Sequence, residues 1–145
     1  MSRLWRRTSI PRNLNNSDLL AKYIFRDKEL RADGQPIPSA VKPRDGDMLS
    51  LFDTSDFPHD QTCQHGHRYA DNIDQGRVHV GYVKFEHGSI LNLNLRMIYD
   101  NDPPRHVSVE FPDEPEKRRE LAKALAATAV VVRPVEKMKY FAPCP

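Results

Sequence analysis

Hydrophobic and polar residues alternate most clearly between residues 77 and 111. An alternation with a period of two is typical of strands that have one buried face. The pattern predicts an antiparallel hairpin over residues 78–99 with a turn around Gly88, and a third strand over His106–Phe111. The apolar positions that we expect to face the core are Val78, Val80, Tyr82, Leu91, Leu93, Leu95, Met97, Tyr99, Val107, Val109 and Phe111.

A helix is predicted to follow the third strand. As the N-cap, Asp113 can accept a backbone N–H of the first turn, and the side chain of Glu116 can bond back to the N–H of Asp113. Pro115 suits the first turn because its missing N–H would have no partner there. The helix should run to about Thr128 and pack through a stripe of small residues, before a further strand over Ala129–Val132. The stripe consists of Leu121, Ala122, Leu125, Ala126 and Ala129.

The first half of the chain has weaker patterns. Leu19, Leu20, Tyr23 and Ile24 share a helical face, which favours a short helix capped by Ser17 or Asp18; a strand over residues 23–25 is the alternative. Prolines and glycines exclude a regular element through residues 33–47. A strand is expected over residues 48–52, and a short helix that starts after residues 55–56 and ends at Gly66.

Length and composition favour a single domain. The chain has 145 residues, of which 39% are hydrophobic and 29% charged, and its formal net charge is +2. We therefore expect an α+β fold: a small, mainly antiparallel sheet of three to four strands, a C-terminal helix packed on one face and an irregular N-terminal half. The expected divisions are an extended basic arm over 1–16, the domain over 17–135 and a tail over 136–145.

Location can also be predicted from the sequence. No apolar run approaches the roughly 20 residues that span a bilayer, and the first residues lack the apolar region of a signal peptide. The only two cysteines, Cys63 and Cys144, are too few for a disulfide scaffold. These features predict a cytoplasmic protein with reduced thiols and no membrane contact.

The densest group of metal-ligating residues consists of His59, Cys63, His65 and His67. Residues four apart on a helix share a face, so the first two have a workable spacing for zinc, which favours four nitrogen and sulfur ligands. The spacing matches no common zinc finger, and a histidine-rich polar loop around a buried thiol remains the alternative. The cofactor prediction is therefore none, or zinc at these four residues.

Acid–base and nucleophilic chemistry receive less support from the sequence. His79 and His106 lie on predicted strands opposite the valine face, and either could act as a general base with Arg77 or Arg105 nearby; the other candidates are His65, His67 and His87. No serine lies in a Gly-x-Ser-x-Gly elbow, and the sequence has no glycine-rich phosphate loop. A metal-independent ribonuclease that uses two such histidines therefore receives little support, because nothing in their spacing distinguishes them from ordinary surface histidines.

Two sets of residues are candidates for binding a partner. The first set contains arginines that could contact a polyanion: Arg3, Arg6, Arg7 and Arg12. The second set contains aromatic residues that could anchor a protein partner: Trp5, Tyr23, Phe25, Tyr140 and Phe141. A solvated arm that keeps the protein soluble is the alternative for the arginines.

Several segments resemble a class of small uncharacterised bacterial proteins. The segments are Leu20–Phe25, Ala40–Arg44, Leu49–Phe52, Pro103–Val107, Phe111–Pro112 and Leu121–Ala126. The resemblance implies a bacterial origin and a small accessory protein, and it brings no activity and no functional residue with it.

The function that we predict from the sequence is that of a non-enzymatic binding or accessory subunit of a bacterial intracellular complex. It would engage a protein partner through exposed aromatic residues, an edge strand and the basic arm. The alternatives are a zinc-dependent hydrolase or nuclease and a nucleic-acid binder that uses the N-terminal arginines.

Overall fold

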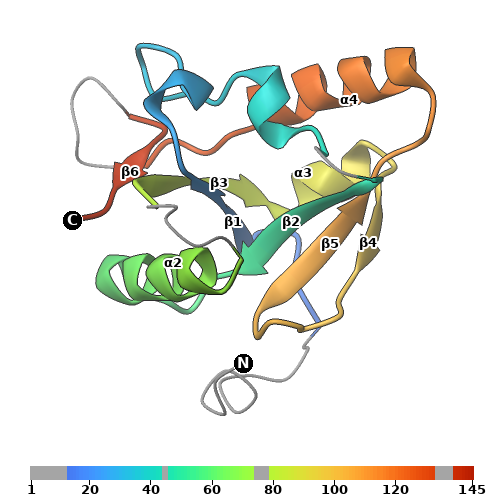
Figure 1. The fold of residues 1–145 in the computed structure, drawn as a ribbon. Helices are drawn as coiled ribbons and strands as arrows, with labels where there is room; N and C mark the ends of the chain where they lie inside the picture. Colours follow the sequence, from blue (N-terminus) through green and yellow to red (C-terminus); the bar gives the residue numbers. More distant parts are fainter. Residues whose placement is uncertain (1–12, 44–45, 74–78, 133–138) are drawn as a thin grey trace.

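The computed structural model describes residues 13–43, 46–73, 79–132 and 139–145. These residues form an open antiparallel sheet of six strands in the order β4-β5-β2-β1-β3-β6 (Figure 1). The strands are β1 (Leu19–Ile24), β2 (Met48–Asp53), β3 (Gly81–Glu86), β4 (Arg96–Ile98), β5 (His106–Glu110) and β6 (Ala142–Pro143). The helices are α2 (His59–Ile73), α3 (His87–Asn92) and α4 (Pro115–Ala127), with 3₁₀ turns η1 (Asp27–Glu29) and η2 (Pro38–Val41).

The two faces of the sheet carry separate cores. On one face, α4 and η2 pack over a larger core that includes Leu51 and Leu125. On the other face, α2 packs over a smaller core that includes Tyr23, Phe52 and Tyr82. Figure 1 shows α4 and η2 above the sheet and α2 below it, nearer to β1 and β3 than to β4 and β5.

The predicted α+β class is confirmed, but the sheet has more strands than expected. The N-terminal half is not irregular, because it supplies β1 and β2 at the centre of the sheet. β1 was expected to be a helix. Its residues are buried on both faces, Leu20 and Ile24 in the larger core and Ala21 and Tyr23 in the smaller one. A strand buried on both faces has no polar alternation, and its apolar run also fits a helix.

The predicted hairpin over residues 78–99 is wrong. β3 pairs with β1 and β6, residues 87–92 form α3, and β4 pairs with β5 at an edge of the sheet. Leu91 is 41% exposed, whereas Leu95 is buried. Asn94 has a φ of 60°, which ends the α3 turn and redirects the chain, so the alternating leucines do not lie on one extended strand.

The other local predictions were better. The strands at residues 48–52 and 106–111 are confirmed as β2 and β5, and the helix at 113–128 is confirmed as α4. α4 is capped by Glu114 without a side-chain hydrogen bond, so the expected capping box of Asp113 and Glu116 is wrong. Residues 129–132 do not form a strand, although Val130 N–H donates to the Lys84 carbonyl at 2.9 Å.

α2 continues past Gly66, where the sequence predicted that it would end. Gly66 lies inside the helix, at a point where the helix packs closely against its neighbours. A Cβ at Gly66 would collide with the imidazole of His79 and lie 2.8 Å from Cε1 of Tyr23. Glycine therefore lets α2 approach the sheet closely. None of the helices in the described ranges is long and apolar enough to cross a membrane.

Candidate functional site

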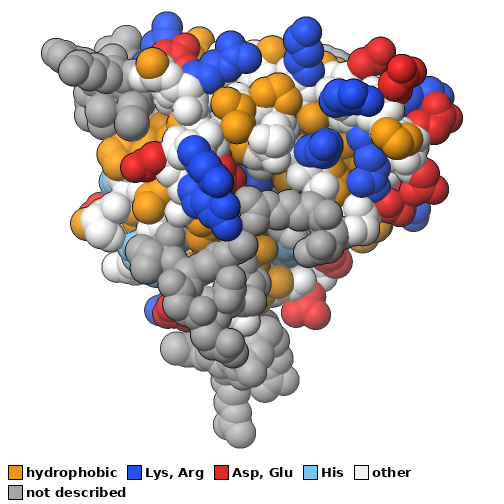
Figure 2. Space-filling view, turned by 45° about the horizontal axis from the view of Figure 1, so that its top comes forward, with side chains coloured by type: hydrophobic (Ala, Val, Ile, Leu, Met, Phe, Trp, Pro, Cys, Tyr) orange, Lys and Arg blue, Asp and Glu red, His pale blue; other side chains and the backbone are white. Residues whose placement is uncertain are grey.

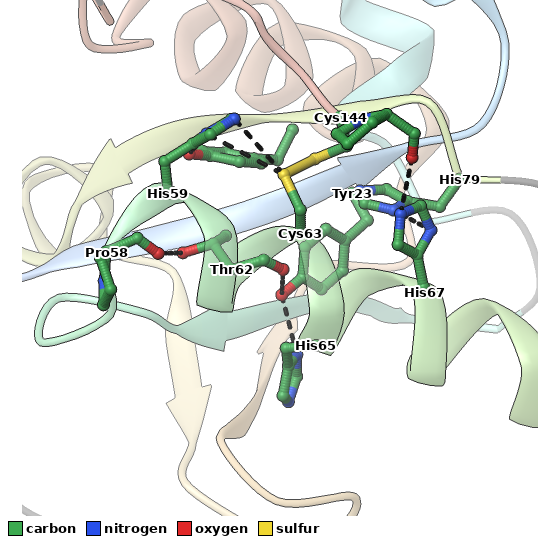
Figure 3. The surroundings of a disulfide bond; sticks show 11 residues. Tyr23, Pro58, His59, Thr62, Cys63, His65, His67, His79 and Cys144 are labelled. Atoms are coloured by element: carbon green, nitrogen blue, oxygen red, sulfur yellow. Dashed lines mark hydrogen bonds between the residues drawn. A yellow bond between two sulfur atoms is a disulfide. The ribbon is translucent and has the colours of Figure 1, made fainter.

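A disulfide joins Cys63 on α2 to Cys144, which follows β6 (Figure 3). The two Cα atoms are 5.6 Å apart, although the residues are separated by 81 positions in the sequence. The prediction of two reduced thiols is therefore wrong. Spacing alone gave no sign of this pair, because only the packing of α2 against β6 brings the two sulfurs together.

The four predicted zinc ligands do not converge on one point. The disulfide occupies the sulfur of Cys63, and His59 Nδ1 lies 2.7 Å from the hydroxyl of Tyr82. His65 and His67 contact different partners, as Figure 3 shows. Among the described residues, no group of three or more histidine, cysteine or acidic side chains could hold a metal ion. His59 Nε2 does lie 3.6 Å from Cys63 Sγ, in keeping with their expected common face.

Two buried histidines, His65 of this cluster and His79 just before β3, are held in neutral networks. His65 Nε2 donates to the Pro104 carbonyl at 3.0 Å, so its Nδ1 accepts from the Tyr23 hydroxyl at 2.8 Å. His79 Nδ1 lies 3.2 Å from His67 Nδ1. Burial lowers the pKa of His65 from 6.5 to about 4, and burial together with the nearby His67 lowers the pKa of His79 to about 4. These rings connect α2 to the sheet as neutral hydrogen-bonding groups.

The aromatic residues predicted to anchor a partner are mostly part of the protein's own core. Tyr23 is 1% exposed and Phe141 4% exposed, so neither can anchor a partner, and this part of the prediction is wrong. Phe25 and Tyr140 are half-buried against the two cores. Trp5 and the arginines Arg3, Arg6, Arg7 and Arg12 lie outside the described residues.

A groove with a volume of about 860 Å³ lies between α4 and the segment that leads into β4. Its apolar lining includes two half-buried leucines, Leu93 and Leu121, and its deeper part reaches the buried side chains of Leu95 and Phe111. We call it the α4 groove and define it by its lining residues. These are Asp47, Leu93, Asn94, Leu95, Arg96, Glu110, Phe111, Pro112, Asp113, Lys117, Glu120, Leu121 and Ala124.

Acidic side chains outnumber basic ones around the α4 groove. Its charged lining residues are four acids, Asp47, Glu110, Asp113 and Glu120, and two bases, Arg96 and Lys117. Figure 2 shows acidic side chains gathered on the side of the molecule where α4 begins. The α4 groove therefore combines an apolar floor with an acidic rim.

The sequence did not predict the α4 groove. Leu93 and Leu95 were expected to pack inside a hairpin, and Leu121 to pack on a sheet. The alternation over residues 91–99 and the amphipathic pattern of α4 marked these residues as apolar, but neither pattern could show that the segment before β4 leaves space beside the helix.

Comparison with known proteins adds no relative on which to base a function. The chain matches no family model, no curated protein sequence and no solved structure. The resemblance to small bacterial proteins therefore stays a prediction, and the function has to be argued from the geometry of this chain alone.

Proposed function

We propose that this chain is a protein-binding module that accepts an extended segment of a partner along β4 and in the α4 groove. The observation that carries the proposal is the position of the groove. Arg96 belongs both to the groove lining and to β4, the strand at one edge of the described sheet.

An edge strand has backbone groups that no neighbouring strand satisfies on its outer side. β4 pairs with β5 through Arg96, Met97 and Ile98, and no described strand lies on its other side. Such an edge can bind an extended segment by β-augmentation, with main-chain hydrogen bonds providing affinity. Alternate side chains of the bound segment would then point toward the α4 groove, which provides specificity.

The charges around the groove indicate the chemistry of the partner. Glu110 pairs with Arg96 at 3.2 Å, and Asp47 pairs with Arg118. Within the described part of the chain, Asp113 and Glu120 have no ion-pair partner. A segment in which Lys or Arg alternates with apolar residues complements this rim, because apolar side chains can fill the floor while cations meet the acids.

The binding surface in this proposal differs from the surface that the sequence predicted. Because Tyr23 and Phe141 are buried, we assign the binding of the partner to the α4 groove instead of to exposed aromatic residues. The edge strand remains part of the proposal, although it is β4 next to β5 rather than a hairpin. A contribution of the basic arm, and binding of nucleic acid through it, stay predictions because the arm's arginines lie outside the described residues.

A selection from a library of random peptides displayed on phage tests the proposal. We expect the purified full chain to enrich sequences in which apolar residues alternate with Lys or Arg. A synthetic peptide of the enriched sequence should bind less tightly as salt is added, because the rim contacts are exposed ion pairs. Bound peptide should also shift the backbone amide NMR signals of Arg96–Ile98.

Two lysine substitutions on the same helix provide the matched comparison. Ala124 lines the groove, whereas Ala127 is exposed and does not. Ala124→Lys should weaken peptide binding by about tenfold or more, through bulk and charge repulsion worth about 1.4 kcal/mol. Ala127→Lys should leave it unchanged. Failure to enrich any sequence, or equal binding by both variants, would contradict the proposal.

A further inference from the structure

Three polar side chains form a continuous chain of hydrogen bonds on the sheet face that carries α2. Ser50 Oγ on β2 lies 2.9 Å from His106 Nε2 on β5. His106 Nδ1 lies 2.7 Å from Oδ1 of Asp100, in the connection between β4 and β5. A hydroxyl, an imidazole and a carboxylate in this order form the arrangement that activates a serine as a nucleophile.

The hydrogen-bond partners determine which nitrogen of His106 carries the proton. An ionised carboxylate can only accept, so His106 Nδ1–H donates to Asp100. A neutral imidazole has a single N–H, so in that form the Nε2 lone pair accepts from the Ser50 hydroxyl. The other oxygen of Asp100 accepts from the Ser108 hydroxyl at 3.0 Å. The ring of Phe52 packs against that of His106 with centroids 5.3 Å apart. These contacts hold the imidazole in the orientation that a general base requires.

The connection between β4 and β5 places Asp100 opposite His106. Asn101 and Arg105 have φ values of 51° and 75°, which are uncommon for residues other than glycine. Arg105 N–H donates to Asn101 Oδ1 at 2.7 Å, and Asn101 N–H donates to the His106 carbonyl at 3.0 Å. Asparagine adopts such φ values readily, so the strained position is Arg105; strain of this kind persists where the surrounding contacts define it, and it is frequent at functional sites.

Ser50 also borders a small cavity. The cavity has a volume of about 240 Å³, and its lining includes Lys22, Lys42 and Tyr69 together with Ser50. Glu29 is the only acid in this lining, and its Oε1 accepts the N–H groups of Phe25 and Arg26. The nucleophile is therefore in contact with its base and with a space for a small molecule, and the two lysines favour a negatively charged one.

We propose that Ser50, His106 and Asp100 catalyse hydrolysis of small carboxylic esters that carry a negative charge. Ser50 Oγ forms a bond to the ester carbonyl carbon while its proton moves to His106 Nε2. The bond to the leaving alkoxide then breaks and the alkoxide takes that proton, which leaves an acyl group on Ser50. Water, activated by His106, releases the acid and restores the serine. This activity is independent of the α4 groove, which lies on the other face of the sheet.

Labelling of the full chain with a fluorophosphonate probe tests the nucleophile. The probe phosphonylates an activated serine and releases fluoride, and peptide mapping by mass spectrometry identifies the modified residue. We expect modification of Ser50 and none in Ser50→Ala, His106→Gln or Asp100→Asn. Ser89→Ala, which changes a serine on α3, should be labelled like the unmodified chain.

Hydrolysis of 4-nitrophenyl esters tests turnover and charge preference. A hemiester of a short dicarboxylic acid should be hydrolysed faster than the uncharged acetate. The Ser50→Ala and His106→Gln variants should lose about 100-fold or more of the rate. Lys42→Gln should reduce the preference for the charged ester without abolishing hydrolysis of the acetate.

Ser50→Cys keeps the test decisive if the alanine variant folds poorly. Both natural cysteines are in the disulfide, so this substitution introduces a single free thiol. Beside His106 that thiol should react with iodoacetamide about tenfold faster than it does in the Ser50→Cys/His106→Gln double variant. An unlabelled wild type, a label on Ser50→Ala equal to that on wild type, or equal thiol reactivity in both cysteine variants would overturn the proposal.

Discussion

The hydroxyl of Tyr23 on β1 lies 2.8 Å from Nδ1 of His65 on α2, and this contact connects the centre of the sheet to the helix that covers it. Both residues are buried, and the other nitrogen of His65 is bonded to the Pro104 carbonyl at 3.0 Å. The imidazole therefore serves as a neutral bridge, and protonation would remove its ability to accept from Tyr23.

Acid should destabilise the fold even at pH values too high for carboxylates to become protonated, because two buried histidines must remain neutral. The pKa values of His65 and His79 in the folded protein are about 4, below the ordinary 6.5 of the unfolded chain. The unfolded state therefore binds more protons as pH falls from 6.5 toward 4, and the free energy of unfolding falls by about 2–3 kcal/mol for each ring. Urea denaturation between pH 7 and 5 measures the start of this loss.

Two substitutions on α2 separate the buried ring from a residue that does not titrate. His65→Gln should reduce the dependence of stability on pH, whereas Gln64→Ala, at the exposed neighbouring position, should leave it unchanged. An identical pH dependence in the unmodified chain and in His65→Gln would contradict the assignment of His65 as a buried neutral group.

Reduction of the Cys63–Cys144 disulfide should lower the free energy of unfolding by about 2–4 kcal/mol. The bond closes a long loop, since the cysteines are 81 residues apart, and its loss increases the entropy of the unfolded chain. Urea denaturation with and without a reductant measures the difference. The Cys144→Ser variant should not respond to the reductant, and detection of two free thiols in the unreduced, unfolded chain would show that the bond does not form.

Ile90 and Leu91 are neighbours with opposite environments, and alanine substitutions should therefore differ between them. Ile90 is fully buried, and Ile90→Ala should cost about 2–5 kcal/mol of stability. Leu91 is 41% exposed on α3, and Leu91→Ala should cost less than about 1 kcal/mol. A hairpin strand over residues 90–99 would give the reverse order, so thermal or urea unfolding of the two variants distinguishes α3 from the strand that the sequence pattern predicts.

Gly66→Ala should destabilise the protein although alanine favours helices. The added Cβ would collide with the His79 ring and approach Tyr23 Cε1, which costs about 1–3 kcal/mol and exceeds the gain in helix propensity of about 1 kcal/mol. Gln64→Ala, at an exposed position two residues earlier on α2, should be neutral or slightly stabilising. A Gly66→Ala variant more stable than the unmodified chain would show that α2 lies farther from the sheet.

The candidate sites could be predicted from the sequence only in part. His106 was recognised as a strand residue opposite the valine face, which is its position in β5. The sequence did not predict that His106 lies beside Ser50 and Asp100, because the three residues share no local motif. The pairing of β2 with β5 and the turn after β4 bring them together. Cys63 and His59 were expected to share a helical face, and they do, but the partner of Cys63 comes from the other end of the chain.

The sequence by itself determined the elements whose ends have local stop signals: β2, β5 and α4 lie where strand- or helix-forming residues are bounded by prolines, glycines or polar residues. Tertiary structure decided that Leu20–Ile24 is a central strand, that Gly66 lies inside a helix and that residues 87–92 turn away from a strand. The physical reason is that these segments are specified by what packs against them. Because β1 is buried on both faces, its sequence lacks the alternation of apolar and polar residues that marks a strand. Gly66 is required by the close approach of His79 and Tyr23 to α2, and not by a turn.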